Sequence, residues 1–368
     1  MLVFFFISGT FASVFSSVST TELFADSWSM KTSMTQARWG LGVIAVADKI
    51  YAIGGLSVDG YAGTNERYDP ATDTWITLKA MPTPRINFGI VAYQEKIYCI
   101  GGSSYDKEGN LEVGKMTEVY DILTNSWATK AAYPYGSFGM DAHVVDGKIF
   151  VVSGYDLFMY DPSEDSWTKK SDMPELYRSI AVFGSVVLDD KIVLIDATNL
   201  DPGSKPKILF YDPKTDVWNK GQVDSLYGAF RGDAVVTTGR YAPQKIYALN
   251  LAVNNVYDPI SDTWSTAESM PTDRVSFGIA VVDDLLYVIG GHMPLPYHGS
   301  FTGYMPGEPL AINEQYVPIG YSSATVGSEH SKPLSTYLIV AALAITTVTI
   351  TAGVFFYFKK RNRKGDPM

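Results

Sequence analysis

Arginine recurs at one position of a repeated pattern in this chain. Arg38, Arg85 and Arg274 each stand 16 residues before the first Gly of a Gly-Gly pair. The arginines in similar places of two less regular repeats are Arg178 and Arg231. A guanidinium offers several N–H donors in one plane, which suits carboxylate, sulfate or phosphate. We therefore predict that these five arginines bind an anionic ligand. The alternative is that each bonds backbone carbonyls or an Asp of the neighbouring repeat.

A long segment, residues 292–310, carries aromatic side chains that are suited to stacking on a sugar or a peptide. It has no helix or strand pattern, and loops of this length in compact domains are often functional. Its candidates for ligand binding are Tyr297, His298 and Tyr304. The alternative is a loop that packs on its neighbour.

A third group has the side chains needed for proton transfer. Asp141 and His143 stand two apart in one apolar run, and Asp233 begins another. Residues two apart on a strand point the same way, and a carboxylate near an imidazole can act as acid and base. The alternative is ordinary polar lining of a wet channel. With four His and one Cys in the chain, and only a weak His292…His298 spacing, we expect no metal and no cofactor.

Five copies of one motif organise the chain. The first reads Tyr68-Asp69-Pro70 and ends at Trp75, and Tyr precedes Trp by seven residues in every copy. The Trp-to-Trp intervals are 52, 40, 51 and 46 residues, a period typical of stacked or radial repeats. A β-branched and aromatic run precedes each Tyr, and several of these runs end in Gly-Gly. Each period therefore holds four short strands, A to D, which predicts one blade of a propeller.

The Gly-Gly, Tyr-Asp-Pro and Trp landmarks resemble the kelch repeat over about residues 26–321. The resemblance implies an all-β, six-bladed kelch-type β-propeller with strand A innermost. Residues 26–31 hold only the D half of the motif and residues 313–318 only the C half, so we expect an N-terminal strand to close the ring. In kelch domains that bind acidic peptides, arginine at this place contacts the ligand. The start of strand A and the B–C loop should share one face.

The two ends of the chain predict export and anchoring. Residues 1–19 are apolar and uncharged and resemble a secretory signal peptide, although Lys and Arg are missing from its start. Residues 20–321 would be the propeller and 322–336 a short stalk. Residues 337–358 carry no charge, and a helix of that length would be about 33 Å long, enough to span a bilayer. The basic tail, 359–368, then predicts a cytoplasmic C-terminus and an extracellular propeller.

These patterns favour a cell-surface binding or adhesion module that recognises an anionic glycan or an acidic protein segment. A formal net charge of −10 argues against nucleic acid as the partner. The resemblance leaves a second function open, a cofactor-free carbohydrate mutarotase or isomerase of the sialic-acid type, which would use the channel carboxylates and arginines. A structural component of the cell envelope is the third. Whether the chain is an enzyme is uncertain from these residues, and a binding role is favoured.

Overall fold

The computed structural model describes residues 26–105, 108, 110–154, 156–174, 184–196, 207–221, 233–296 and 304–322, whose main sheets are six four-stranded antiparallel blades. Blade 1 consists of β2 (Gly42–Val46), β3 (Lys49–Ile53), β6 (Asn65–Asp69) and β7 (Thr74–Leu78). Blade 2 consists of β8 (Gly89–Tyr93), β9 (Lys96–Ile100), β12 (Thr117–Asp121) and β13 (Ser126–Lys130). Blade 3 consists of β14 (Met140–Val145), β15 (Lys148–Ser153), β16 (Asp156–Asp161) and β17 (Ser166–Lys169).

The second half of the chain repeats this arrangement. Blade 4 consists of β18 (Ser185–Leu188), β19 (Lys191–Asp196), β20 (Lys207–Asp212) and β21 (Val217–Lys220). Blade 5 consists of β22 (Asp233–Val236), β23 (Ile246–Asn250), β24 (Val253–Asp258) and β25 (Thr263–Ala267). Blade 6 consists of β26 (Gly278–Val282), β27 (Leu285–Ile289), β30 (Asn313–Val317) and β1 (Ser27–Lys31).

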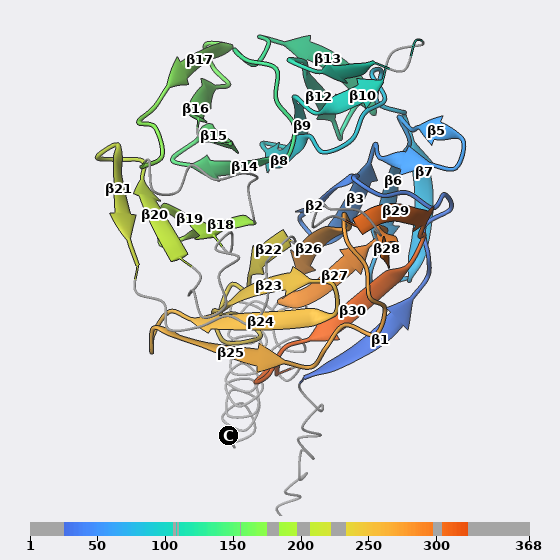
Figure 1. Ribbon diagram of the computed structural model, residues 1–368, viewed down its shortest axis with the longest axis vertical. Helices are drawn as coiled ribbons and strands as arrows, with labels where there is room; N and C mark the ends of the chain where they lie inside the picture. Colours follow the sequence, from blue (N-terminus) through green and yellow to red (C-terminus); the bar gives the residue numbers. More distant parts are fainter. Residues whose placement is uncertain are drawn as a thin grey trace, which may run out of the picture. The chain divides into compact units, whose positions relative to one another are not determined.

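The ring closes as the two incomplete motifs predict. The N-terminal strand β1 pairs antiparallel with β30, with Trp28 opposite Tyr316, and so becomes the outermost strand of blade 6. The innermost strands β2, β8, β14, β18, β22 and β26 contact one another in turn around the ring (Figure 1). The prediction of an all-β, six-bladed propeller closed by an N-terminal strand is confirmed.

Burial explains the composition of each strand. Strand B lies between A and C and has neighbouring blades on both faces, so its side chains are nearly all apolar. Residues Ile97 to Ile100 of β9, for example, are at most 4% exposed. The outermost strands alternate between exposed and half-buried residues, as in β7. The core is therefore a series of apolar layers between adjacent blades, one of which packs Val91 and Ile100 of blade 2 against Ala142 and Val151 of blade 3.

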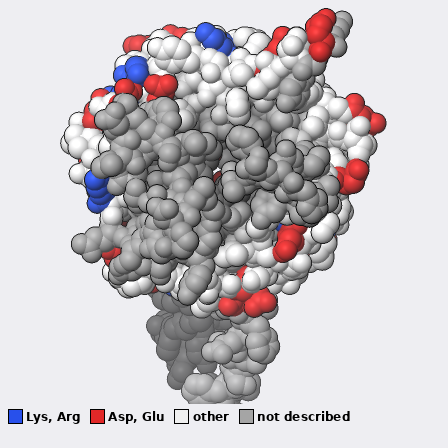
Figure 2. Space-filling model, in the orientation of Figure 1, with Lys and Arg blue, Asp and Glu red and all other residues white. Residues whose placement is uncertain are grey.

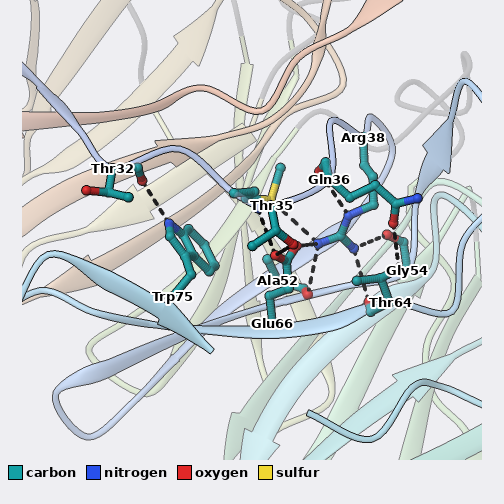
Figure 3. A network of polar contacts seen from close by, with 10 residues as sticks. Thr32, Thr35, Gln36, Arg38, Ala52, Gly54, Thr64, Glu66 and Trp75 are labelled. Atoms are coloured by element: carbon teal, nitrogen blue, oxygen red, sulfur yellow. Dashed lines mark hydrogen bonds and ion pairs between the residues drawn. The ribbon is translucent and has the colours of Figure 1, made fainter. Parts of the chain in front are cut away.

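The recurring Tyr and Trp form an inter-blade clamp. In blade 1, the hydroxyl of Tyr68 donates to the Asp73 carboxylate over 2.6 Å, and that carboxylate accepts the backbone N–H of Thr32 from blade 6. The Trp75 indole N–H donates to the Thr32 carbonyl over 2.8 Å (Figure 3). The corresponding indole bonds begin at Trp28, Trp127, Trp167 and Trp218. These bonds tie the outer strands of blades 1, 2, 3, 4 and 6 to the preceding blade.

The predictions for the chain ends fall outside the described residues. These are the signal peptide at 1–19, the span at 337–358 and the tail at 359–368, together with the stalk beyond Ser322. Within the described ranges, the structure contains no helix that is long and apolar enough to cross a membrane.

Candidate functional site

Arg38 lies in a buried ion pair and is 0% exposed. One of its terminal nitrogens is 2.6 Å from the Glu66 carboxylate, and the other donates to the Thr64 carbonyl over 3.0 Å (Figure 3). Thr35 binds the second carboxylate oxygen through both its backbone N–H and its hydroxyl. Burial lowers the pKa of the Arg38 guanidinium, and the charge of Glu66 opposes that shift. We call this pair, with its threonine, the Arg–Glu latch.

The same latch occurs in blades 2 and 6. Arg85 pairs with Glu118 and donates to the Cys99 carbonyl over 3.0 Å. Arg274 is 2.7 Å from Glu314 and donates to the Val288 carbonyl over 3.0 Å. Thr83 and Thr272 supply the hydroxyls that bond the two carboxylates. Each latch joins the segment before strand A to strands B and C of its own blade.

These latches change the interpretation of three predicted ligand-binding residues. We expected Arg38, Arg85 and Arg274 to form an open positive rim, but they are at most 2% exposed and their charges are paired within the protein. A buried cation without a partner is costly, so the fold supplies a carboxylate for each. Among the described atoms on the face in Figure 2, Lys and Arg lie apart from one another. Ligand binding by these three residues stays a prediction, and it would require the latches to open.

The sequence contains a second feature that predicts the latch, in addition to the position of the arginine. Glu stands two residues before the repeat Tyr in blades 1, 2 and 6, the blades that have the latch. In blades 3, 4 and 5 the same position holds Phe158, Leu209 and Asn255. Blade 3 also has Ser137 at the arginine position, where it bonds the Ser153 hydroxyl. In blades 1, 2, 3 and 6, the arginine and its carboxylate therefore occur together or not at all.

The remaining predicted ligand-binding residues are placed only in part. Arg178, Arg231, Tyr297 and His298 lie outside the described residues. Tyr304 begins β29 (Tyr304–Pro309), which pairs antiparallel with β28 (His292–Pro296). The expectation that this segment has no strands was therefore wrong. Its prolines hide the strand pattern, and the pairing tolerates them through a register shift between His292 and Pro294.

Two further hairpins follow strand B in the same way. They are β4 (Leu56–Ser57) with β5 (Gly60–Tyr61) in blade 1, and β10 (Ser103–Tyr105) with β11 (Leu111–Val113) in blade 2. Each begins just after the Gly-Gly pair, and bridges such as Ile86 to Ser103 tie it to the residue after the latch arginine. Gly102 has φ 96°, and a Cβ there would lie 2.8 Å from the Ile86 carbonyl oxygen. Only glycine fits this close approach. We call the face that carries these hairpins the hairpin face.

Four polar side chains gather on the innermost strands of blades 3, 4 and 5. The Ser185 hydroxyl is 2.7 Å from the Asp141 carboxylate and 2.6 Å from Nε2 of His143. Asp233 begins β22, and its Oδ1 accepts the N–H of Ala234 over 2.9 Å. We call Asp141, His143, Ser185 and Asp233 the channel cluster. The sequence suggested three of these residues, but it gave no sign of Ser185, because its partners come from another blade.

The surroundings of the channel cluster oppose charge. The register partner of each cluster residue on the neighbouring strand B is apolar. These partners, in the order Asp141, His143, Ser185 and Asp233, are Val152, Phe150, Leu194 and Leu249. Desolvation therefore raises the pKa of both carboxyls, and the nearby Asp141 charge raises that of Asp233 further. Desolvation also lowers the pKa of His143 to about 4. The two aspartates and His143 keep some exposed surface, so these groups lie in a poorly solvated place that solvent still reaches.

Comparisons with known proteins agree with the landmarks. Two models of the kelch motif match the chain, one over residues 38–82 and 84–131 and the other over 140–174. Mouse kelch-like protein 35 is 25% identical over 188 residues, which cover 48% of this chain and 30% of that protein. Kelch-like protein terF of Aspergillus terreus is 25% identical over 251 residues, which cover 52% of this chain and 53% of that protein.

The chain belongs to the kelch-repeat β-propeller family. Its matched part spans about a third to a half of the length of these two relatives. A solved structure of YjhT superposes with a TM-score of 0.59 at 19% identity, covering 77% of this chain and 96% of that one. That likeness shows the shared propeller fold alone.

The innermost strands of this kelch propeller differ between its two halves. In blades 6, 1 and 2 they begin with glycine and are apolar throughout except for Tyr93, whereas in blades 3, 4 and 5 they carry the channel cluster. Among the residues described, no group of three or more His, Cys, Asp or Glu is placed to hold a metal ion. The side chains of the cluster can transfer protons and form hydrogen bonds.

The hairpin face of the propeller exposes apolar side chains where blades 2 and 3 meet. The exposed fractions lie between 36% and 54% for Leu111, Val113, Met116, Tyr135 and Phe138. Two backbone bonds hold this surface together, since Tyr133 donates to Lys115 and Ser137 donates to Gly114. The Tyr135 ring also rests edge-on against Phe158 at 5.6 Å. We call these five side chains the apolar patch. It is fixed to the scaffold by these contacts.

Proposed function

We propose that this kelch propeller is a binding module that takes an acidic protein segment or an anionic glycan on its hairpin face. A kelch propeller is a framework that suits protein binding, and fold alone does not name the ligand. The observation that carries the proposal is the distribution of the latches. Three of the five repeat arginines have a carboxylate partner inside their own blade, whereas the repeats of Arg178 and Arg231 hold Leu209 and Asn255 in that place.

Arg178 and Arg231 lie outside the described residues, and their repeats have no Glu at the position of the latch carboxylate. In the proposal they bind the anionic group of the ligand, and Tyr297, His298 and Tyr304 contact it from the long segment. The apolar patch supports a protein partner, because a fixed group of exposed apolar side chains is typical of the centre of an interface. An acidic protein segment with one or two apolar side chains fits these features best.

The test is binding of the full-length protein to arrays of acidic and neutral peptides and glycans at low and high salt. The Arg178→Ala/Arg231→Ala double variant should lose at least about tenfold in affinity for the anionic ligand, roughly 1.4 kcal/mol. The matched control is Lys49→Ala/Lys96→Ala, which removes the same charge at the ends of β3 and β9 opposite the Gly-Gly pairs. Equal binding by both double variants, or no binding by the wild type, would refute the proposal and leave a structural role.

A second candidate function is a cofactor-free carbohydrate mutarotase or isomerase of the sialic-acid type. The channel cluster favours it, because two carboxyls with raised pKa values can hold one proton between them and serve as acid and base. Mutarotation of a freshly dissolved sugar, followed by polarimetry, tests it. Turnover by the wild type that Asp141→Asn abolishes would support the enzyme, and its absence would leave the binding module.

The proposed location follows from the ends of the chain. An apolar segment at 337–358 followed by the basic tail at 359–368 would hold the propeller at the outer face of a membrane. Protease treatment of intact cells tests this. Loss of the propeller from intact cells, with the tail protected, is the expected result.

A further inference from the structure

We propose that Asp141, Ser185 and His143 form a proton relay, and that with Asp233 they make a channel site for a neutral or cationic sugar in its cyclic hemiacetal form. The inference rests on the second candidate function and goes beyond it in two respects. It assigns Ser185 and His143 as residues that position and move a proton. It also replaces the anionic sugar of that function with a neutral or amino sugar.

The relay follows from the single proton of Ser185. Its Oγ has two close partners, Asp141 Oδ2 at 2.7 Å and His143 Nε2 at 2.6 Å. A hydroxyl donates only one hydrogen bond, so when it donates to the Asp141 carboxylate it must accept from the N–H of His143. Since burial lowers the pKa of His143 to about 4, the ring is neutral at pH 7 and its Nδ1 is left as an acceptor.

A proton that arrives at Nδ1 can therefore move along the whole chain. Nε2 passes its proton to Oγ, and Oγ passes its own proton to Asp141. His143 is then again neutral, now protonated on Nδ1, and Asp141 has changed from carboxylate to carboxyl. Burial of the cluster disfavours a positively charged His143 ring. The relay meets this requirement, because the ring is neutral before and after the transfer.

Gly184 brings Asp233 next to this relay. Its φ is 104°, and a Cβ on it would lie 3.0 Å from the Ala234 nitrogen and 3.3 Å from the carbonyl carbon of Asp233. The strand that carries Ser185 is thus pressed against the start of β22. Because Asp233 Oδ1 accepts the Ala234 N–H, its other oxygen is the one available to hold a proton. Asp141, stabilised as an anion by Ser185, and a protonated Asp233 form the acid–base pair.

The charge of the site selects the ligand. The strands β14, β18 and β22 contribute two Asp and no Lys or Arg. Of the innermost strands beside them, β26 contributes no titratable group and β8 contributes only Tyr93, at its far end. A ligand carboxylate would stand beside the Asp141 anion in a place where desolvation already penalises charge. A neutral sugar avoids this cost, and the ammonium group of an amino sugar is attracted to the Asp141 carboxylate.

The chemistry available is opening of a hemiacetal ring. The Asp141 carboxylate takes the proton of the anomeric hydroxyl, the C1–O bond of the ring breaks with its electron pair on the ring oxygen, and Asp233 gives that oxygen a proton. One proton is taken up and one is given, and an aldehyde with a free hydroxyl results. Rotation about the C1–C2 bond and the reverse steps close the ring as either anomer, so no co-reactant is needed.

The test uses three sugars that differ only in charge: galactose, galactosamine and galacturonate. Titration calorimetry on the full-length protein at pH 6.5 should show binding of the first two, with galacturonate at least about tenfold weaker. In buffers of different ionisation enthalpy, galactosamine should release protons from the wild-type protein and fewer from Asp233→Asn. Ser185→Ala should weaken binding, whereas Ser153→Ala, which removes a buried serine outside the cluster, should not.

Three results would overturn the proposal: galacturonate binding as tightly as galactose, no binding of any of the three, or unchanged affinity and proton release in both Ser185→Ala and Asp233→Asn. Polarimetry distinguishes failure of this proposal from failure of the mutarotase function. Binding without mutarotation refutes the enzyme and leaves the sugar site. Mutarotation that persists in Ser185→Ala and Asp233→Asn refutes the relay and leaves the enzyme.

Discussion

Blades 6, 1 and 2 differ from blades 3, 4 and 5 in four related ways. The first three blades are consecutive in the closed ring, and each has the Gly-Gly pair, the Arg–Glu latch, a hairpin after strand B and an apolar innermost strand with Tyr93 as its exception. The described parts of the other three have no latch, no such hairpin and an innermost strand that carries one or two polar side chains of the channel cluster. The inter-blade clamp, by contrast, occurs in both halves.

This difference separates two tasks within one repeated fold. The clamp ties neighbouring blades together, and its indole bond occurs in blades 1, 2, 3, 4 and 6, whereas the Trp264 indole of blade 5 has no such bond to a described residue. The latch is needed to fix the segment before strand A where a hairpin must be held, so it accompanies the hairpins. Where the latch is missing, the innermost strands are free to carry Asp and His. The comparison therefore identifies blades 6, 1 and 2 as the scaffold and blades 3, 4 and 5 as the half with the channel cluster.

Breaking one latch should have the largest effect. Glu66→Leu leaves the Arg38 charge buried without its carboxylate, and we expect the free energy of unfolding to fall by about 3–5 kcal/mol. The double variant Arg38→Met/Glu66→Leu should recover most of this loss, because both charges are then gone. Denaturant unfolding measures both. A single variant as stable as wild type would mean that the latch does not hold the scaffold half.

Substituting the second glycine of the Gly-Gly pair should have the next largest effect, and it should cost more stability in blade 2 than the matched change costs in blade 3. Gly102→Ala places a Cβ 2.8 Å from a carbonyl oxygen at φ 96° and should cost about 1–3 kcal/mol. Gly154→Ala is the matched change in blade 3, at φ 57° with no atom within 4 Å, and should cost about 1 kcal/mol or less. Thermal unfolding of the two variants gives the comparison. Equal losses would argue against a special close approach in the scaffold half.

The channel cluster should give the half of blades 3, 4 and 5 its own pH dependence. The pKa of Asp233 is raised to about 8 in the folded chain, so its own contribution to stability is full below the pKa of an ordinary Asp and is lost as the pH rises towards 8. Asp233→Asn removes this loss and should be more stable than wild type by about 1–2 kcal/mol at pH 8, with less difference at pH 5. Unfolding at both values measures it. A variant that is less stable at pH 8 would contradict the sign.

The clamp should give the smallest effect and no difference between halves. Tyr68→Phe in blade 1 and Tyr160→Phe in blade 3 each remove one hydroxyl that donates to an Asp over 2.6 Å. Each should cost about 1 kcal/mol. Chemical unfolding curves measure the two losses, and a clearly larger cost in one half would show that the clamp is not shared equally.

The sequence predicted whatever depends on the repeat itself. The Tyr and Trp spacing, the four strands in a blade and the closure by β1 follow from residues close together in the chain. The buried state of Arg38 was harder, because the partner Glu66 lies 28 residues away and is recognised only when latched and unlatched blades are compared. The arginine positions alone suggested an open rim, whereas the Glu two residues before the repeat Tyr marks the blades that have a latch.

Contacts between blades were beyond prediction. Ser185 meets Asp141 and His143 only because two innermost strands, 42 to 44 residues apart in sequence, lie side by side in the ring. Nothing in the short run Ser185–Leu188 marks its serine as different from any polar strand end. The β28–β29 hairpin was missed for a local reason, since Pro294 and Pro296 remove the donors by which strands are usually recognised.

The division of tasks is tested most directly by measuring stability and galactosamine affinity on the same two variants. Arg38→Met/Glu66→Leu alters a latch, and Ser185→Ala/Asp233→Asn alters the channel cluster. The account predicts that, at temperatures where all proteins are folded, the latch variant keeps wild-type affinity and the channel variant loses it while remaining at least as stable at pH 8. A latch variant that loses affinity to the same degree, or a channel variant that binds like wild type, would contradict it.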